Sequence, residues 1–297
     1  MSSLPKTVTV LNCPNGSTVY LVGTAHFSRE SIQDVRDTIQ KVRPTVVMLE
    51  LCPQRQVMLQ YSEEDILREA EDINFAKVRL FIRRDGLIAG IMQSLFLKLS
   101  AEVTKKLGIA PGGEFRAGYE EGIKCGARIL LGDRMVNVTF QRALYSLNFL
   151  QKMRFYFAIA RTLTEDISIT SEEVENMKNK DMVDMLVGEL AKEFPTVTQV
   201  LVDERDKVLA YSLKSAAYVT NTPSGPPVTV VGIVGMGHVK GIEKLWNKDI
   251  VGIKEIMTVP RPSRTARLVS LAIKVSIATA IGVASYYAFR RFRFRFR

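Results

Sequence analysis

The sequence predicts an α/β fold with a largely parallel central sheet, a helical insertion and a C-terminal transmembrane helix. Short β-branched apolar runs recur between stretches of helical periodicity, which is the pattern of strands covered by helices on both faces. The middle of the chain, about residues 60–220, is mostly helical in pattern. Residues 268–289 form an apolar segment long enough to cross a bilayer.

Four strands of the predicted sheet are clear from their apolar runs, at residues 19–23, 46–49, 129–131 and 228–234. Between the first two, Ser28 or Ser31 can cap a helix that runs to about Val42, and Pro44 stops it. This part of the chain is therefore expected to form a compact βαβ unit. Residues 87–99 of the insertion are apolar but too short to span a membrane, so we expect a buried helix there rather than a second membrane contact.

The composition is that of a globular protein with a sizeable core, since 46% of the 297 residues are hydrophobic and 24% are charged. The formal net charge is +10, but residues 261–297 hold nine basic residues and no acidic one. Without them the 41 basic residues fall to 32, against 31 acidic ones. The excess charge therefore belongs to the tail, where it favours lipid headgroups rather than nucleic acid as the partner.

The cysteines and the N-terminus indicate the compartment. Cys13, Cys52 and Cys125 form neither a C-x-x-C pair nor a disulfide framework, which favours a reducing environment. The first residues contain no basic region followed by an apolar one, so no secretory signal is expected. We therefore expect the folded domain to face the cytosol.

The expected organisation is a single domain at residues 1–259, a basic linker at 260–267, a transmembrane tail anchor at 268–289 and an Arg/Phe tail at 290–297. The anchor carries one charge, Lys274, whose stem can reach the headgroups, and Tyr286 and Tyr287 suit the opposite interface. An amphipathic helix packed on the domain is the alternative. Basic flanks on both sides are typical of the mitochondrial outer membrane, with the endoplasmic reticulum and the peroxisome as alternatives.

Polar residues follow each clear strand at its carboxyl end: Gly23-Thr24-Ala25-His26, Glu50, Gly132-Asp133-Arg134 and Gly235-Met236-Gly237-His238. In open parallel sheets this edge is where ligands bind. The chain has two histidines, His26 and His238, and each stands three residues after a glycine, which lets the backbone turn sharply off the strand. With Glu50 they would supply two nitrogens and a carboxylate, a set that suits Zn²⁺, Mn²⁺, Co²⁺ or Fe²⁺ and leaves positions for water. The alternative is that each histidine only satisfies local hydrogen bonds.

Other charged residues near these motifs have structural alternatives. Arg55 stands one helical turn after Glu50 and could pair with it, because a buried Glu50 needs a partner. Glu114 begins a helix after Gly112 and Gly113, where a carboxylate favours the helix dipole and could act as a cap. A nucleotide-binding phosphate loop is excluded, because the third glycine and the lysine of such loops are missing. Two charge clusters are typical of solvated ion pairs: Asp133-Arg134 and Glu204-Arg205-Asp206.

Six motifs stand in order along the chain: Val22-Gly23-Thr24-Ala25-His26-Phe27-Ser28, Glu50-Leu51-Cys52 followed by Arg55, Pro111-Gly112-Gly113-Glu114-Phe115, Leu131-Gly132-Asp133-Arg134, Glu204-Arg205-Asp206 and Val234-Gly235-Met236-Gly237-His238. Together they closely resemble the TraB/PrgY family and come in that family's order. They span about residues 18–245. The chain is similar to the eukaryotic TraB-domain-containing proteins, which are linked to mitochondria.

The resemblance implies a TraB domain at residues 1–259 and roles for particular residues. The wider superfamily includes the Tiki proteins, which have two Gly-x-x-His motifs and are regarded as metal-dependent proteases, and bacterial proteins implicated in shutting down peptide pheromones. By this resemblance, His26 and His238 would be metal ligands, and Glu50 would be a ligand or base. The cleft would be lined by Arg55, Glu114, Arg134 and Arg205. The second motif here is Gly-Met-Gly-His, whereas Tiki proteins typically have Asn directly after the first glycine.

Two functions are consistent with these patterns. The first is a metal-dependent hydrolase, a peptidase that acts on a peptide or protein substrate at the cytosolic face of mitochondria. A bound Mn²⁺, Co²⁺ or Zn²⁺ would bring the pKa of water to about 7. The second is a non-catalytic adaptor or regulator of organelle contact or mitochondrial morphology, in which the site binds a ligand or is only structural. Tight partner binding that survives loss of His26 would identify the adaptor.

Overall fold

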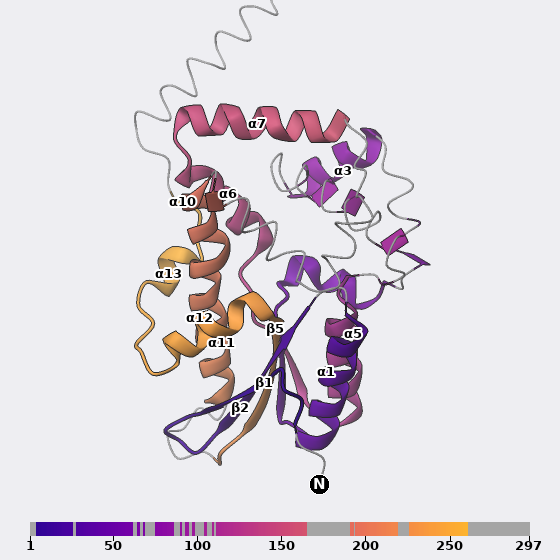
Figure 1. The fold of residues 1–297 in the computed structure, drawn as a ribbon, viewed down its shortest axis with the longest axis vertical. Coiled ribbons are helices and arrows are strands. Elements are labelled where there is room, and N and C mark those ends of the chain that lie inside the picture. Colours follow the sequence, from indigo (N-terminus) through magenta and orange to yellow (C-terminus); the bar gives the residue numbers. More distant parts are fainter. Residues whose placement is uncertain are drawn as a thin grey trace, which may run out of the picture. The chain divides into compact units, whose positions relative to one another are not determined.

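Figure 1 shows the fold in a computed structural model, which describes residues 4–25, 28–61, 75–85, 111–164, 194–218 and 226–260, with 191, 192 and single residues or pairs between 64 and 109. The chain divides into two compact units, Met1–Val259 and Pro260–Arg297. The elements below all belong to the first unit. His26 and the predicted membrane segment at 268–289 lie outside the described residues. No helix in the described part is long and apolar enough to cross a membrane.

A five-stranded sheet forms the middle layer of the first unit. Its strands are β1 (Val8–Asn12), β2 (Thr18–Thr24), β3 (Val46–Leu49), β4 (Arg128–Leu131) and β5 (Thr229–Gly235). The spatial order is β1, β2, β5, β3 and β4. β1 runs antiparallel to β2, and the other neighbours are parallel. The predicted α/β class and the four predicted strands are confirmed.

The edge strand β1 is an addition to the predicted sheet. It joins β2 through a turn in which the Cys13 N–H donates to the Ser17 carbonyl at 2.9 Å and Gly16 adopts a φ of 82°. Pro14-Asn15-Gly16 between two β-branched runs is a hairpin signal that could have predicted it. β1 lies at the edge of the sheet, and its residue Val10 is exposed. An edge strand needs fewer apolar residues than a strand buried on both faces, so β1 is harder to recognise in the sequence than the inner strands.

Helices cover both faces of the sheet (Figure 1). α1 (Arg29–Val42) and α5 (Gly113–Lys124) lie on one face, and α11 (Glu204–Ala217) and α12 (Met236–Trp246) lie on the other. Each face has its own apolar cluster, and β3 contributes alternate residues to the two, so that all four of its side chains are buried. Burial on both faces is why the inner strands read as continuous apolar runs in the sequence.

The predicted connection between β2 and β3 is present, and its capping can now be assigned. The Ser28 hydroxyl accepts the Ser31 N–H at 3.1 Å, which makes Ser28 the N-cap of α1. The Ser31 hydroxyl instead accepts the Ala25 N–H at 2.9 Å and ties the strand end to the helix. α1 ends at Val42, and its C-cap residue Arg43 has a φ of 43° and precedes Pro44. β5 lies between β2 and β3, so the two strands of this unit do not pair with each other.

The remaining helices of the described ranges lie between β3 and β5 in the chain or after α12. They are the 3₁₀-helix η1 (Pro53–Leu59), α3 (Phe75–Asp85), α6 (Val136–Ser146), α7 (Phe149–Thr164), α10 (Pro195–Thr198), the π-helical η2 (Gln199–Asp203) and α13 (Ile253–Ile256). α10, η2 and α11 follow one another without a break. The π turn therefore comes directly before Glu204-Arg205-Asp206, a placement that is frequent at functional sites. Most of residues 87–99 lie outside the described part of the chain.

Candidate functional site

The carboxyl ends of β3, β4 and β5 meet at one edge of the sheet and bring the predicted polar residues together. Glu50 follows β3 directly, and its N–H donates to the Ile233 carbonyl of β5 at 3.0 Å. On the other side, the Asp133 N–H donates to the Leu51 carbonyl at 3.3 Å. The backbone ladder thus extends past the strands and fixes both carboxylates at the same edge. Glu50 is 4% exposed, so it requires charged or polar partners.

Arg205 lies at the centre of this edge and bridges the two carboxylates. Its Nε and Nη2 atoms donate to the two oxygens of Asp133, at 3.1 and 2.9 Å. Its Nη2 also donates to Glu50 Oε1. The guanidinium therefore holds β3 and β4 side chains together from the first turn of α11. Glu50, for which the sequence suggested Arg55 as a possible partner, pairs with Arg205 in the structure.

His238 lies next to this bridge, in the first turn of α12. Its Nδ1 atom lies 2.6 Å from Asp206 Oδ1, and its Nε2 atom lies 3.3 Å from Glu50 Oε1. The second oxygen of Glu50 accepts the Gly235 N–H at 2.7 Å. A Cβ on Gly241 would clash with Asp206 Oδ2, so only a glycine there lets α12 approach Asp206 closely enough. The side chains of Glu50 and His238 are thus each oriented by a second contact.

The charges of the cluster favour one further positive charge. Glu50, Asp133 and Asp206 are three carboxylates, and Arg205 supplies one positive charge. Burial alone would lower the pKa of His238, but the charge of Glu50 and the hydrogen bonds to Asp206 and Glu50 raise it to about 9. Burial would likewise lower the pKa of Arg205, and the charges of Asp133 and Glu50 outweigh that effect and raise it.

The protonation of His238 decides how it meets Arg205, whose Nη1 atom lies 3.0 Å from its Nε2. That contact is a hydrogen bond only if Nε2 is unprotonated, because a guanidinium has no acceptor. The raised pKa instead favours a protonated ring, with Nε2–H directed at Glu50. Two cations among three carboxylates also leave a smaller net charge than one.

A second buried network begins at Arg134, beside the first. The Arg134 guanidinium donates to Glu204 Oε2, to the Val200 carbonyl at 3.0 Å and to the Ile256 carbonyl at 2.8 Å. Burial lowers the pKa of Arg134, and the contact with Glu204 opposes this effect. Its donors are directed at α6, η2, α11 and α13. The structure therefore does not bring the Arg134 guanidinium to Glu50 or His238.

Arg142 of α6 completes the second network and was not a candidate from the sequence. It donates to both oxygens of Glu204, at 2.8 and 2.7 Å, and to the carbonyls of Glu255 and Thr258, each at 2.9 Å. Its partners lie 62 or more positions away in the sequence, so no local pattern marks it. Asp133 and Asp206 were also absent from the candidate residues. The sequence did offer a sign of both: Asp133 follows a predicted strand and precedes Arg134, and Asp206 follows Arg205.

Glu204 should make the protein sensitive to acid. Burial would raise its pKa, but hydrogen bonds from Arg142 and Arg134 lower it. A lowered folded-state pKa gives stability that is present above the unfolded value of about 4.5 and is lost as the pH falls through the folded value. Glu204→Gln leaves two arginines without their shared charge and should lower the free energy of unfolding by about 2 to 3 kcal/mol at pH 7.

Urea unfolding at pH 7 and pH 4 measures this loss. The variant should lie closer to the wild type at pH 4 than at pH 7, because the wild type has then lost part of the same contribution. Glu243→Gln, at an exposed position of α12, is the matched control and should leave both midpoints unchanged. Equal midpoints for Glu204→Gln and wild type at pH 7 would contradict the buried network.

Arg55 and Glu114, which were predicted to line the cleft, lie in two different helices. Arg55 lies in η1 and is half-buried. Glu114 is buried in the first turn of α5, which begins at Gly113 after Gly112 turns with a φ of 82°. α5 runs antiparallel to the strand that follows it, so its N-terminus lies at the carboxyl edge of the sheet. Glu114 therefore places a carboxylate at the positive end of the helix dipole on the same edge as the site.

The predicted metal site can be tested against these donors. Two of the three predicted ligands are brought together, since Glu50 Oε1 and His238 Nε2 lie 3.3 Å apart, close enough to share an ion about 2 Å from each. A carboxylate on the far nitrogen, as Asp206 provides here, is the usual support of a metal-binding imidazole. The third predicted ligand, His26, lies outside the described residues. Two residues before it, Thr24 of β2 pairs with Gly235 of β5, so the end of β2 lies beside the strand that leads to His238. No group of three His, Cys, Asp or Glu side chains in the described ranges could hold a metal ion.

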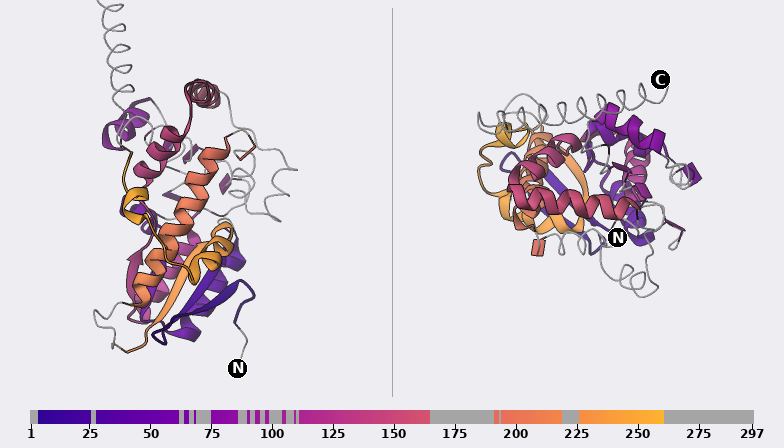
Figure 2. Two further views of the ribbon diagram at one scale, coloured as in Figure 1. Left: turned by 90° about the vertical axis from the view of Figure 1, so that its left-hand side faces the viewer. Right: turned by 90° about the horizontal axis from the view of Figure 1, so that it is seen from above.

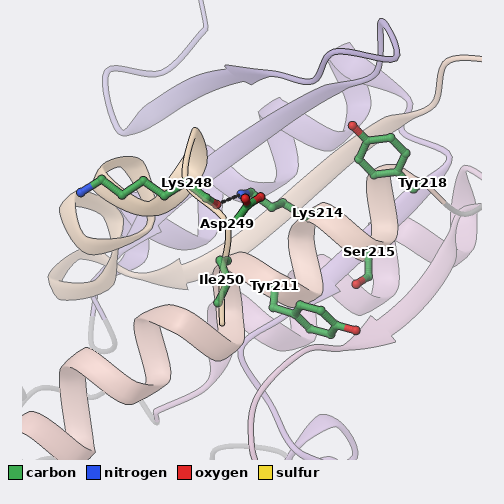
Figure 3. Close-up of a pocket in the computed structure, with 7 residues that line it drawn as sticks. All are labelled: Tyr211, Lys214, Ser215, Tyr218, Lys248, Asp249 and Ile250. Carbon is green, nitrogen blue, oxygen red and sulfur yellow. Dashed lines mark hydrogen bonds between the residues drawn. The ribbon is translucent and has the colours of Figure 1, made fainter. Parts of the chain in front are cut away.

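A pocket of about 320 Å³ lies elsewhere on the unit, between α11 and the loop after α12 (Figure 3). It is lined by Tyr211, Lys214, Ser215, Tyr218, Lys248, Asp249 and Ile250. The Lys214 ammonium donates to the carbonyls of Lys248, at 2.7 Å, and Leu245, at 3.3 Å. Its charge therefore holds the loop, and none of the predicted site residues lines this pocket.

Comparison with known proteins supports the motif assignment. Residues 9–249 match the TraB/PrgY/gumN family. The TraB domain-containing proteins of Homo sapiens and Mus musculus are 44% and 43% identical to this chain, over 97% of it and 78% of each relative. An uncharacterised protein of Methanocaldococcus jannaschii is 28% identical over 91% of this chain and 65% of its own length. With the six motifs in order and the match covering most of its length, the chain belongs to the TraB/PrgY/gumN family.

Proposed function

We infer that the protein is a metal-dependent hydrolase that cleaves peptide bonds, with Glu50, His238 and His26 as ligands of one divalent ion, Mn²⁺, Co²⁺ or Zn²⁺. The observation that carries this proposal is the convergence of Glu50 Oε1 and His238 Nε2, 3.3 Å apart and each oriented by a second contact. The excess of carboxylates over cations in the cluster favours binding of a further cation at this place.

The residues around the bound ion would have different roles. Asp206 would keep the Nδ1 proton of His238 in place, and an ion bound at Nε2 would displace the proton carried there, while the Gly235 N–H orients Glu50. Asp133 holds Arg205 through its Nε and Nη2 atoms, and the guanidinium would supply the positive charge for an oxygen on which negative charge develops. When bound, the ion would supply Lewis acidity and a water of lowered pKa. The alternative role of Glu50 is that of a general base: if Glu50 does not bind the ion, its carboxylate would accept a proton from the water.

The proposed location is the cytosolic face of the mitochondrial outer membrane. It is supported by the apolar segment at residues 268–289 and by the basic residues on both sides of it. The endoplasmic reticulum and the peroxisome are the alternatives. The isolated segment 261–297 fused to a fluorescent protein tests this proposal, and an even cytosolic distribution of the fusion would contradict it.

A non-catalytic adaptor or regulator of organelle contact or mitochondrial morphology is the second candidate. The observation that favours it is the bridge of Arg205, whose guanidinium already neutralises Glu50 and Asp133. A cluster satisfied in this way can be a purely structural joint between β3, β4 and α11. Under this reading the cluster stabilises a surface that binds a partner.

Metal binding by the purified full chain separates the two candidates. The hydrolase should retain about one Mn²⁺, Co²⁺ or Zn²⁺ per chain after dialysis, and His238→Asn should lose it. Glu121→Gln is a control that removes a buried carboxylate of α5 bound to Gln40 and Lys124. It should keep the ion. No retained ion in the wild type, together with partner binding that survives replacement of His26, would decide for the adaptor.

A further inference from the structure

The helix α7 carries a stripe of large apolar side chains that the unit leaves exposed. Phe149 is 69% exposed, Leu150 70%, Met153 54% and Phe157 73%. Phe149, Met153 and Phe157 recur every four residues, and Leu150 is adjacent, so the four side chains lie on one face of the helix. An isolated exposed Phe is ordinary, but a continuous stripe of this size marks an interaction surface.

The opposite side of α7 fastens the helix to the unit. The Phe155 ring meets the Phe194 ring edge to face, with 6.2 Å between their centroids. Phe155 packs on a small apolar cluster contributed by α6, α10 and η2. Because Phe155 lies on the side of the helix away from Phe149 and Leu150, the stripe is directed outward. Figure 1 shows α7 along its length, and the left view of Figure 2 shows it end-on.

Basic residues border the stripe on both sides. Lys152 stands three residues after Phe149, and Arg154 stands four after Leu150, so each lies beside one margin of the apolar face. The segment Phe149–Thr164 contains no acidic residue. The exposed ring of Tyr145, 5.9 Å from the Lys152 ammonium, adds an aromatic group at the same margin.

We propose that α7 lies on an anionic bilayer surface, with the four apolar side chains between the headgroups and the acyl chains and with Lys152 and Arg154 at the level of the phosphates. A narrow apolar stripe with a basic residue on each margin is the pattern of helices that lie in a membrane interface. Lysine and arginine stems can cover apolar surface while their charges reach the phosphates. The excess of positive charge along α7 complements anionic lipid. This contact is separate from the polar site and from the segment at 268–289.

Depth-dependent fluorescence quenching tests the contact in the full chain. A thiol-reactive bimane would be placed at Phe157→Cys, with Cys125→Ser in the background because Cys13 and Cys52 are buried. The protein would be mixed with vesicles of phosphatidylcholine and phosphatidylserine that contain a nitroxide-labelled phospholipid. The label should lose about half of its fluorescence or more. The same label at the exposed position of Tyr211→Cys, on α11, should keep it.

Two further variants probe the stripe and its margins. Phe149→Ser with Met153→Ser removes apolar surface from exposed positions, so the fold should persist while quenching falls to the level of the Tyr211 control. Lys152→Glu with Arg154→Glu should weaken the contact about tenfold, as should vesicles of phosphatidylcholine alone. Equal quenching in neutral and anionic vesicles would overturn the assignment of an anionic surface.

Iodide in the aqueous phase distinguishes other occupants of the stripe. If bimane at position 157 is shielded from iodide without vesicles, the stripe is covered by protein, either the same chain or a second copy, and the proposal is wrong. If iodide reaches the label equally with and without vesicles, α7 does not meet lipid. Shielding that appears only with anionic vesicles supports the proposal. Failure of this test leaves the metal site unaffected, because the two use different residues.

Discussion

Glu50→Gln is expected to abolish turnover while the protein stays folded. The change keeps the volume of the side chain and one carbonyl oxygen but removes the charge that a ligand or general base requires. Loss of general-base function alone should reduce the rate by a factor of about 10² to 10⁴. The measurement is cleavage of a broad peptide library by the purified full chain with added Mn²⁺, Co²⁺ or Zn²⁺.

The stability of the same variant should change much less than its turnover. Asp133 continues to bind Arg205 through two hydrogen bonds, so the arginine is not left without a counter-charge. The carbonyl oxygen of the introduced glutamine side chain can still accept the Gly235 N–H. The remaining loss is an imperfect contact with Arg205, for which about 1 to 3 kcal/mol is expected.

Glu121→Gln is the matched control for this experiment. It also replaces a buried carboxylate by its amide, but on α5, where the partners are Gln40 and Lys124 rather than the site residues. A similar loss of stability with unchanged turnover is expected. If the wild type cleaves no peptide with any of the three ions and Glu50→Gln differs from it only in melting temperature, the hydrolase proposal is wrong and the adaptor remains.

The contrast between Arg55 and Arg205 shows how far the sequence could predict this site. Glu50 was recognisable because a carboxylate directly follows four apolar strand residues, and such a group must have a partner. The nearest arginine in the sequence was Arg55. The actual partner stands 155 positions away and is delivered by the crossing of α11 over the other face of the sheet. Local spacing carries no information about such a contact.

The elements themselves were predictable where local chemistry determines them. Ser28 and Pro44 mark the limits of α1, and the two-sided burial of β3 gives a run that sequence reading detects. The order of the strands was not predictable, because β5 comes last in the chain and inserts between β2 and β3. That insertion places Gly235 and His238 beside Glu50. The convergence of the site is therefore a property of the topology.

Arg205→Met is expected to be the most destabilising single change in the cluster. It removes the guanidinium that bridges Glu50 and Asp133, so those two buried carboxylates lose the positive charge that they share. Breaking a buried ion pair in this way typically costs about 3 to 5 kcal/mol. Urea unfolding at pH 7 measures the loss. Arg36→Met, whose partner Glu120 lies 3.9 Å away at an exposed position, is the control and should change stability by less than about 1 kcal/mol.

Added metal distinguishes the two functions in this variant. If the cluster is built for a divalent ion, Mn²⁺ or Co²⁺ can take the positive charge that Arg205 supplied, and at about 100 times its dissociation constant it should restore about 2.7 kcal/mol. A structural cluster should gain nothing from the ion. Should Arg205→Met fail to fold, Arg205→Lys keeps one positive charge without the two-point contact with Asp133, and the same comparison applies to it. A variant that is destabilised and indifferent to both ions would mean that the carboxylates gathered at this sheet edge serve to bind an arginine.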